Sequence, residues 1–246
     1  MYNPVKDGMD KTTRGVEYTE TTPPNEIREL VVCFWELKTT STLEEDFHLH
    51  AIPDACVDIM FNEINTDIAG VTGLKVKYEV LNLGKVFHYV GIQFSPGVWR
   101  APRDQIADHY IGEPYSGELP FIETNNKMVG ANFHQKQLIM TELVRQLQSE
   151  KIIEENLLTS KIVAHIDDIH TVADMSDIVD ISPRQLQRIL KKSTGLSPHD
   201  FLKILRLQQS FTYDYNTHYA DQSHFIRSFR SITGYTPSQY FSKFDV

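Results

Sequence analysis

Apolar and polar residues follow two different patterns along the chain, and the change between them separates a front half from a back half. Short apolar stretches, several of them separated by glycines, occur at 29–37, 55–63, 74–84 and 86–97. Stretches of this length and spacing are typical of β-strands joined by turns. Because no long helical pattern interrupts them, they predict a β-sandwich or barrel rather than alternating strands and helices.

The segment 74–84 has the clearest alternation of apolar and polar residues. Every second position is apolar, at Leu74, Val76, Tyr78 and Val80. Successive side chains of a strand point to opposite faces of the sheet, so we expect these four residues on one face and Lys75, Lys77 and Glu79 on the other. Residues 1–22 are polar and carry charges of both signs, which predicts a flexible tail.

From about Asn132 the apolar residues recur at helical spacing. Helices are expected at 132–150 and 156–170, followed by a short helix at 172–179 that Thr171 caps. The apolar stripe of the first two helices fits packing on the front half better than a dimer contact. The class is therefore α+β, and the chain divides into a tail (1–22), a β-rich sensor or assembly domain (23–125), a helical connector (126–160) and an all-α domain (161–246).

Two segments of the back half repeat one plan. Residues 182–201 read SPRQLQRILKKSTGLSPHDF, and residues 221–240 read DQSHFIRSFRSITGYTPSQY. In each copy a polar cap begins a helix with one apolar and one basic face, a glycine ends it, and Ser/Thr-Pro begins the next helix. Chance rarely reproduces apolar, basic and turn positions together, so the repeat indicates two copies of one unit. The helix at 172–179 and the Arg- and Gln-rich helix after it form a helix-turn-helix.

The charges are distributed unevenly along the chain, so the net charge alone does not exclude binding to nucleic acid. The chain carries a net charge of −9, which at first opposes binding to nucleic acid. Residues 1–160 hold 14 basic and 24 acidic residues, whereas residues 182–230 hold 8 basic and 3 acidic ones. A local basic face is what attraction to phosphate requires, and it lies on the repeated helices.

These motifs together resemble a known family. The run SPRQLQRIL-KKSTGLSP, then RLQQ at 206–209, then DQSHFIRSF-RSITGYTPSQY is similar to the DNA-binding domain of AraC/XylS-type bacterial transcription regulators. The front half is similar to a subgroup with an FW segment (Phe34-Trp35), an IPDAC-VDIMF segment (52–61) and a GIQFSPG segment (91–97). The resemblance implies a β-rich sensor domain, of which a cupin-like barrel is one form, and two helix-turn-helix units joined by a long helix.

The resemblance implies that the protein is a sequence-specific regulator of transcription in the bacterial cytoplasm. In this family activators are commoner than repressors. Its partners would be double-stranded promoter DNA and RNA polymerase, and a small-molecule effector and a homodimer stay open. Arg and Gln can each grip one base with two hydrogen bonds, which agrees with the implied base contacts. The expected DNA-binding residues are Arg184, Gln185, Gln187, Arg188, Lys191 and Lys192 in the first unit and Gln222, Ser223, Arg227 and Arg230 in the second.

One departure from the family concerns the second unit. Only 11 residues separate RLQQ from Asp221, about ten fewer than family members usually have. A helix rises 1.5 Å per residue, so this segment cannot complete the connecting helix and also supply a first helix for the second unit. The sequence therefore predicts a shortened second unit without its scaffold helix. An interaction module with impaired DNA binding, which modulates another regulator, is the alternative function.

No catalytic motif, cofactor or metal site is expected. His48, His50, Asp54, Cys56, Asp58 and His88 form a tempting set, but no further Glu or His completes a known ligand spacing, so a metal-dependent β-barrel enzyme with a DNA-binding tail is the weakest alternative. The chain has only two cysteines, which favours a reducing compartment. No apolar run approaches ~18 residues, which argues against a membrane span.

Overall fold

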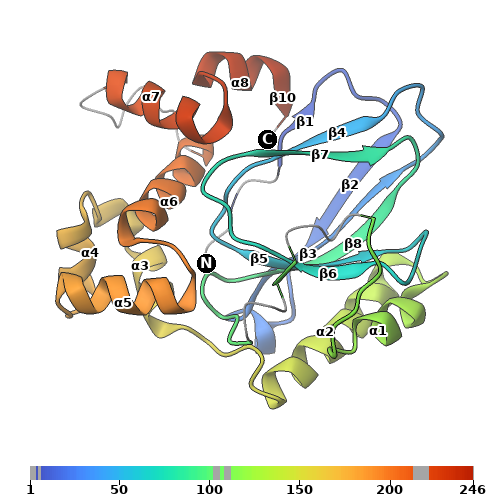
Figure 1. Cartoon of the computed structure of the whole chain (residues 1–246), viewed down its shortest axis with the longest axis horizontal. Coiled ribbons are helices and arrows are strands. Elements are labelled where there is room, and N and C mark those ends of the chain that lie inside the picture. The colour runs from blue at the N-terminus through green and yellow to red at the C-terminus, as the bar shows by residue number, and fades with distance from the viewer. Residues whose placement is uncertain (1–3, 5–6, 102–105, 108–111, 213–221, 246) are drawn as a thin grey trace.

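The computed structural model describes residues 4, 7–101, 106–107, 112–212 and 222–245. A β-rich half lies beside a helical half (Figure 1). The described strands are β1 (Met9–Asp10), β2 (Val16–Thr21), β3 (Val31–Thr39), β4 (Phe47–Ala51), β5 (Val57–Asn62), β6 (Ala69–Thr72), β7 (Glu79–Gly84), β8 (His88–Phe94), β9 (Ile106–Ala107) and β10 (Phe244–Asp245).

The main sheet has the strand order β2-β3-β8-β5-β6-β9, and its neighbours are antiparallel except for the parallel pair β6 and β9. A two-stranded sheet of β4 and β7 packs on one face of it through a core that includes Leu37, Met60, Leu83 and Tyr89. The α+β class and the β-rich front half are therefore confirmed, and the two layers form a sandwich with a short second sheet.

The expectation of a flexible tail at 1–22 is wrong. Strand β2 pairs with β3 from Val16 to Thr21, and β1 pairs with β10 at the other end of the chain. The residues of β2 alternate in exposure, as a half-buried edge strand should, but its polar composition hid it. Backbone pairing to a neighbouring strand stabilises such a segment even where its side chains bury little apolar surface.

The segment 74–84 forms a strand only from Glu79 onward. Val76, Tyr78 and Val80, which the alternation placed on one face, are 44%, 41% and 51% exposed, whereas Leu81 and Leu83 pack in the core. The core takes this other face of β7 because that phase buries two leucines and leaves Asn82 outside.

Helices cover the other face of the main sheet and build the back half. The described helices are α1 (Phe121–Met128), α2 (Phe133–Ser149), α3 (Leu157–Ala164), α4 (Val172–Ile178), α5 (Pro183–Ser193), α6 (Pro198–Thr212), α7 (Gln222–Thr233) and α8 (Pro237–Lys243), with 3₁₀ turns η1 (Asn25–Ile27) and η3 (Ile166–Asp168).

Helices α1 and α2 belong to the core of the β-rich half. Met140, Leu143, Val144 and Leu147 of α2 are buried against the main sheet, so the helix packs within the chain as expected. The helix expected at 156–170 ends at Ala164, and a 3₁₀ turn follows. None of the described helices is long and apolar enough to cross a membrane.

The two halves meet through the segment Ile52–Cys56. Ile52 packs in the core of α7 and α8 with Phe225 and Phe229, and Ala55 packs in the core of α4, α5 and α6 with Leu186. The front half therefore contributes a residue to each of these two cores of the helical half.

A second contact joins the halves at His50. Its buried ring stacks on Tyr78 at 4.8 Å and on Phe244 at 4.7 Å between ring centroids, and Tyr240 and Tyr235 flank it. The Tyr78 amide also donates to the carbonyl of Ile232 at 2.7 Å. Together with the β1 and β10 pairing, these contacts hold the C-terminal helices on the β-rich half.

Candidate nucleic-acid interface and ligand cavity

Helix α5 is positioned by strong local signals. Ser182 caps its first turn, accepting from the Gln185 amide, and Pro183 occupies the first helical position. Gly195, with a φ of +79°, follows the end of the helix in the left-handed conformation that suits glycine. Leu186 and Leu190 are fully buried, which fixes the opposite face of α5 toward solvent.

The solvent face of α5 carries the expected basic and amide residues. All are exposed, and five of them border one shallow surface depression: Arg184, Gln187, Arg188, Lys191 and Lys192. Residues three and four apart share one helix face, so this set forms a continuous strip. Such a strip of guanidinium, amide and ammonium groups can contact base edges and phosphates together.

Two of the expected contacts already have local partners. The Gln185 side-chain oxygen accepts from the Ser182 amide at 3.0 Å and from its hydroxyl at 2.8 Å. The Lys191 ammonium donates to the Gly195 carbonyl at 2.7 Å, beyond the C-terminus of α5. Both interactions stabilise helix ends, which favours Arg184, Gln187 and Arg188 as the groups available to read bases.

The second unit is described in part. Ser223, Arg227 and Arg230 on α7 are exposed, and the Arg227 guanidinium donates to the Ser223 carbonyl at 3.2 Å. The Gln222 side chain and residues 213–221 lie outside the described residues, so the predicted loss of the scaffold helix stays a prediction. Thr236 caps α8 in the same way that Ser182 caps α5, as the repeat predicts.

The match to a family model falls on this second unit. Residues 215–242 match the model "Bacterial regulatory helix-turn-helix proteins, AraC family". This part of the chain is therefore similar to an AraC-family helix-turn-helix. Residues 182–201 share the plan of cap, apolar face, glycine and Ser/Thr-Pro start that residues 221–240 show.

The front half matches a different model. Residues 19–111 match "Domain of unknown function (DUF6597)", and nothing in the match confirms the subgroup expected from the FW, IPDAC-VDIMF and GIQFSPG segments. The structure gives two of these segments a physical role. Trp35 pairs with Gly91 across β3 and β8, and a Cβ at Gly91 would meet the Trp35 ring at 2.3 Å.

Two solved structures of ToxT from Vibrio cholerae are similar to the chain at 11% sequence identity. One is described at 1.65 Å, covers 96% of this chain and 98% of its own, and superposes with a TM-score of 0.43. The other, bound to (E)-4-(8-methylnaphthalen-1-yl)but-3-enoic acid, covers 96% and 99% with a TM-score of 0.45. No curated protein matches the chain.

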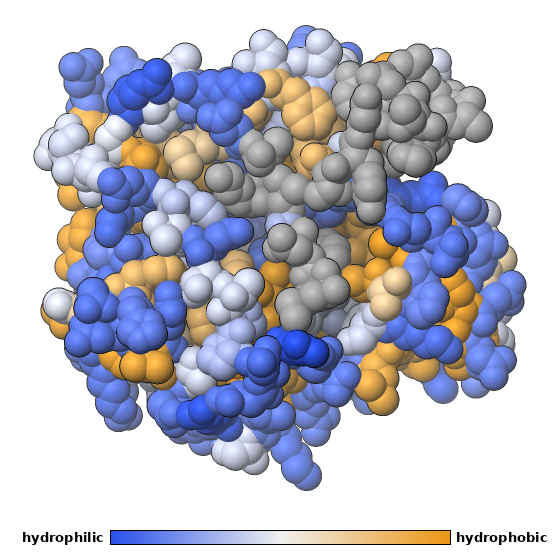
Figure 2. Space-filling view, turned by 180° about the vertical axis from the view of Figure 1, so that it is seen from behind, coloured by the Kyte–Doolittle hydropathy of each residue, from blue (hydrophilic) through white to orange (hydrophobic). Residues whose placement is uncertain are grey.

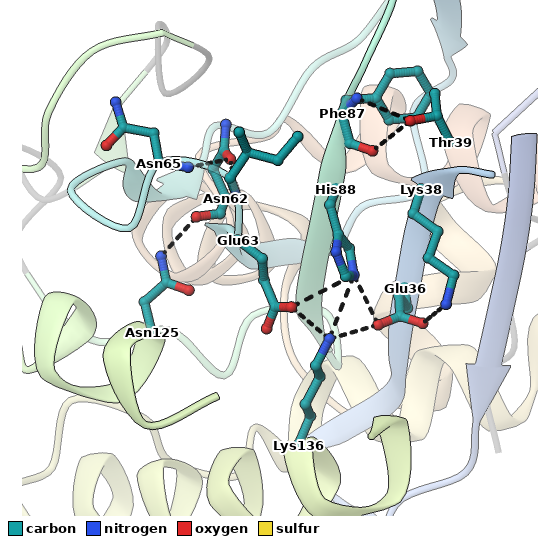
Figure 3. A network of polar contacts seen from close by, with 11 residues as sticks. Glu36, Lys38, Thr39, Asn62, Glu63, Asn65, Phe87, His88, Asn125 and Lys136 are labelled. Atoms are coloured by element: carbon teal, nitrogen blue, oxygen red, sulfur yellow. Dashed lines mark hydrogen bonds and ion pairs between the residues drawn. The ribbon is translucent and has the colours of Figure 1, made fainter. Parts of the chain in front are cut away.

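A buried charge cluster joins α2 to the main sheet (Figure 3). The Lys136 ammonium lies 2.8 Å from Glu36, 2.5 Å from Glu63 and 3.4 Å from the His88 ring nitrogen. Glu36, Glu63 and His88 have the ligand types of a metal site, but the ammonium occupies the space between them. Burial raises the pKa of Glu36, and hydrogen bonds from Lys136, Lys38 and His88 outweigh it and lower that pKa to about 2.

The six residues considered as metal ligands in the sequence do not form one site. His48 is exposed, His50 lies among the aromatic rings between the halves, and His88 belongs to the charge cluster. The other three, Asp54, Cys56 and Asp58, line a cavity between the two sheets.

This cavity is the feature that the sequence did not reveal. It has a volume of about 140 Å³ and lies between the short sheet and the main sheet. Burial raises the pKa of Asp7 to about 7 and that of Asp54 to about 6. Burial and the neighbouring charge of Asp54 hold the pKa of Asp58 well above its usual range. Asp7 was missed because it lies in the expected tail, whereas Asp54 and Asp58 were considered only as possible metal ligands.

Proposed function

We propose that the chain is a sequence-specific, DNA-binding regulator of bacterial transcription that reads its promoter with helix α5. The observation that carries the proposal is the strip of Arg184, Gln187 and Arg188 on a helix whose other face is fixed by Leu186 and Leu190. A rigid helix with bidentate side chains on its exposed face suits the major groove. The AraC-family match of the second unit supports the same reading.

The affinity for DNA comes mainly from phosphate contacts. The charge of the rest of the chain confines these contacts to the helix-turn-helix. The β-rich half is acidic, so it repels DNA that approaches from other directions. The face seen in Figure 2 is hydrophilic over much of its area, with hydrophobic residues in separate patches. We expect a cytoplasmic activator that contacts RNA polymerase, responds to a small effector in the β-rich half, and reads a second base set through Arg227.

The test is selection of bound sequences from a pool of random duplexes by the full-length protein. We expect an enriched motif that Arg188→Ala loses, while Arg28→Ala, which removes an exposed arginine on the β-rich half, keeps it. Two motifs about one helical turn of DNA apart would add the second unit as a reader. No enrichment by the folded protein would overturn the proposal and favour an interaction module that acts through another regulator.

A further inference from the structure

A buried histidine lies at the contact between the β-rich half and the C-terminal helices. His50 on β4 is 3% exposed, and its ring stacks on the Tyr78 and Phe244 rings with interplanar angles of 23° and 21°. The rings of Tyr235 and Tyr240 flank it, each at 5.5 Å between centroids. One side chain of the β-rich half is therefore enclosed by aromatic rings, three of which belong to the helical half.

The His50 ring has no hydrogen-bond partner within the described part of the chain. Both of its nitrogens are buried and unpaired there, although a neutral imidazole carries one donor and one acceptor. A protonated ring carries two donors and a full charge, and burying an unpaired charge costs far more than burying a neutral polar group. The surroundings of the ring therefore favour its neutral form.

The titratable and charged groups around the ring do not balance a positive charge. Three tyrosines touch it, and the charge that acts on it is the Lys243 ammonium, which lies 5.2 Å from the centre of the Phe244 ring. The carboxylates on the adjoining segments have other partners: Asp7 the Ile52 amide, Asp10 Thr12, Glu79 Lys75 and Asp245 Lys11. Among the described residues, none of these four carboxylates pairs with His50.

The state of protonation of His50 depends on whether the contact is closed. Burial lowers the pKa of His50 and the Lys243 charge lowers it further, while the carbonyls of Thr233 and of His50 itself oppose this without cancelling it. An imidazole that leaves the contact titrates near its ordinary pKa of about 6.5. Acid therefore adds a proton to the open form before the closed one. The contribution of His50 to the contact is complete above about pH 7 and is lost as pH falls below about 6.5.

One defined part of the molecule depends on the contact at His50. The Tyr78 amide donates to the Ile232 carbonyl at 2.7 Å, and the Gly8 amide, just before β1, donates to the His50 carbonyl at 3.2 Å. Together with the pairing of β1 and β10, these bonds fix the end of α7, helix α8 and β10 beside β4 and β7 (Figure 1). Helix α5 is held separately, because Ala55 packs in its core.

We propose that His50 is an acid-sensitive latch: when its ring takes up a proton, the contact opens and the end of α7, helix α8 and β10 loosen from the β-rich half, while α5 keeps its place. Ile52, which packs in the core of α7 and α8, keeps the loosened helices near the β-rich half. The latch goes beyond the proposed function and does not depend on it. It bears on DNA binding only through α7, which carries Arg227.

The test is hydrogen–deuterium exchange of the full-length protein at pH 7.5 and 5.5, with each rate divided by the intrinsic rate at that pH. We expect protection of the Tyr78 amide and of β10 to fall about tenfold at pH 5.5, because an open ring is mostly protonated there and the closed ring stays neutral. Protection of α5 should stay unchanged. His50→Phe keeps a ring in the stack and takes up no proton, so its protection should not fall.

Two comparisons isolate His50 from other groups. Burial raises the pKa of Asp7 to about 7, so Asp7 titrates in the same range with the opposite sign, but His50→Phe retains it and the difference from the native protein removes its effect. His48→Phe is the matched control, since His48 is exposed on the same strand, and it should open with acid as the native protein does. Circular dichroism checks folding, and His50→Gln is a second variant that stays neutral.

Three results would overturn the latch: equal protection of the native protein at both pH values, an equal loss in His50→Phe and His50→Gln, or a loss that includes α5. An NMR titration of the native protein tests the same point without any variant, because a His50 ring that titrates at or above 6.5 contradicts the proposal. No DNA is present in these experiments. Failure of the latch therefore leaves sequence selection untouched, and failure of sequence selection leaves the latch untouched.

Discussion

The buried side chain of Gln208 on α6 donates a 2.9 Å hydrogen bond to the carbonyl of Pro53 in the β-rich half. The two residues are 155 positions apart, and Pro53 stands between Ile52 and Asp54 on the wall of the cavity. One end of this bond lies on α6 of the helical half. The other end lies in the segment Ile52–Cys56, through which the two halves meet.

Replacing Gln208 with alanine should lower the free energy of unfolding by ~1–3 kcal/mol, because the Pro53 carbonyl would lose a buried donor. Gln209→Ala is the matched control, since that side chain makes its 2.6 Å bond to Asp167 in an exposed position. Urea denaturation measures both. An equal effect of the two variants would show that the contact between the halves adds nothing of its own.

Replacing Lys136 with methionine should lower the free energy of unfolding by ~3–5 kcal/mol, because Glu36 and Glu63 would lose the buried ammonium that lies between them and would keep only Lys38 and His88 as partners. Adding Glu36→Gln and Glu63→Gln to the same variant should recover much of the loss. Lys127→Met removes an exposed pair with Glu123 and should cost less than ~1 kcal/mol. Denaturant midpoints of the four proteins check this, and a Lys136→Met protein as stable as the native one would contradict it.

Much of the helical half could be predicted from the sequence because its signals are local. The cap Ser182, the core residues Leu186 and Leu190 and the stop residue Gly195 all lie between positions 182 and 195. Each of them predicts the same helix. The strip of Arg184, Gln187 and Arg188 follows from that periodicity, although its contact with DNA stays a prediction.

The cavity and the charge cluster could not be predicted, because their residues are far apart in the sequence and meet only through tertiary packing. The Asp7 carboxylate accepts a hydrogen bond from the Ile52 amide, 45 positions away in the sequence. The Lys136 ammonium donates to Glu36, which is 100 positions away. Neither separation leaves a periodic trace in the sequence. The buried face of β7 could not be predicted for a related reason: only the pairing with β4 and the core beneath the strand distinguish Leu81 and Leu83 from Val80.

Replacing Asp7 with asparagine should change how stability depends on pH. Burial raises the pKa of Asp7 from 3.8 to about 7, so the folded state binds a proton that the unfolded state has released in this range. Its contribution to stability is therefore complete below about pH 4 and is lost as pH rises toward 7. The native protein should lose stability relative to Asp7→Asn across this range, measured by urea titrations at each pH. Asp67→Asn should show no such trend, and a difference that grows in the other direction would refute the assignment.

Replacing Lys192 with alanine should weaken DNA binding without changing which sequence is preferred. Its ammonium lies at the C-terminal end of α5, exposed and beside Arg188 in the surface depression, which suits a phosphate rather than a base. Loss of one phosphate contact should reduce the slope of log affinity against log salt by about 0.9, equally for the selected duplex and an unrelated one. Fluorescence anisotropy at several salt concentrations measures the slope, and Lys127→Ala on α1 serves as the charge-matched control. Arg188→Ala should instead weaken the selected duplex more than the unrelated one, so a uniform loss in both variants would mean that α5 binds phosphate without reading bases.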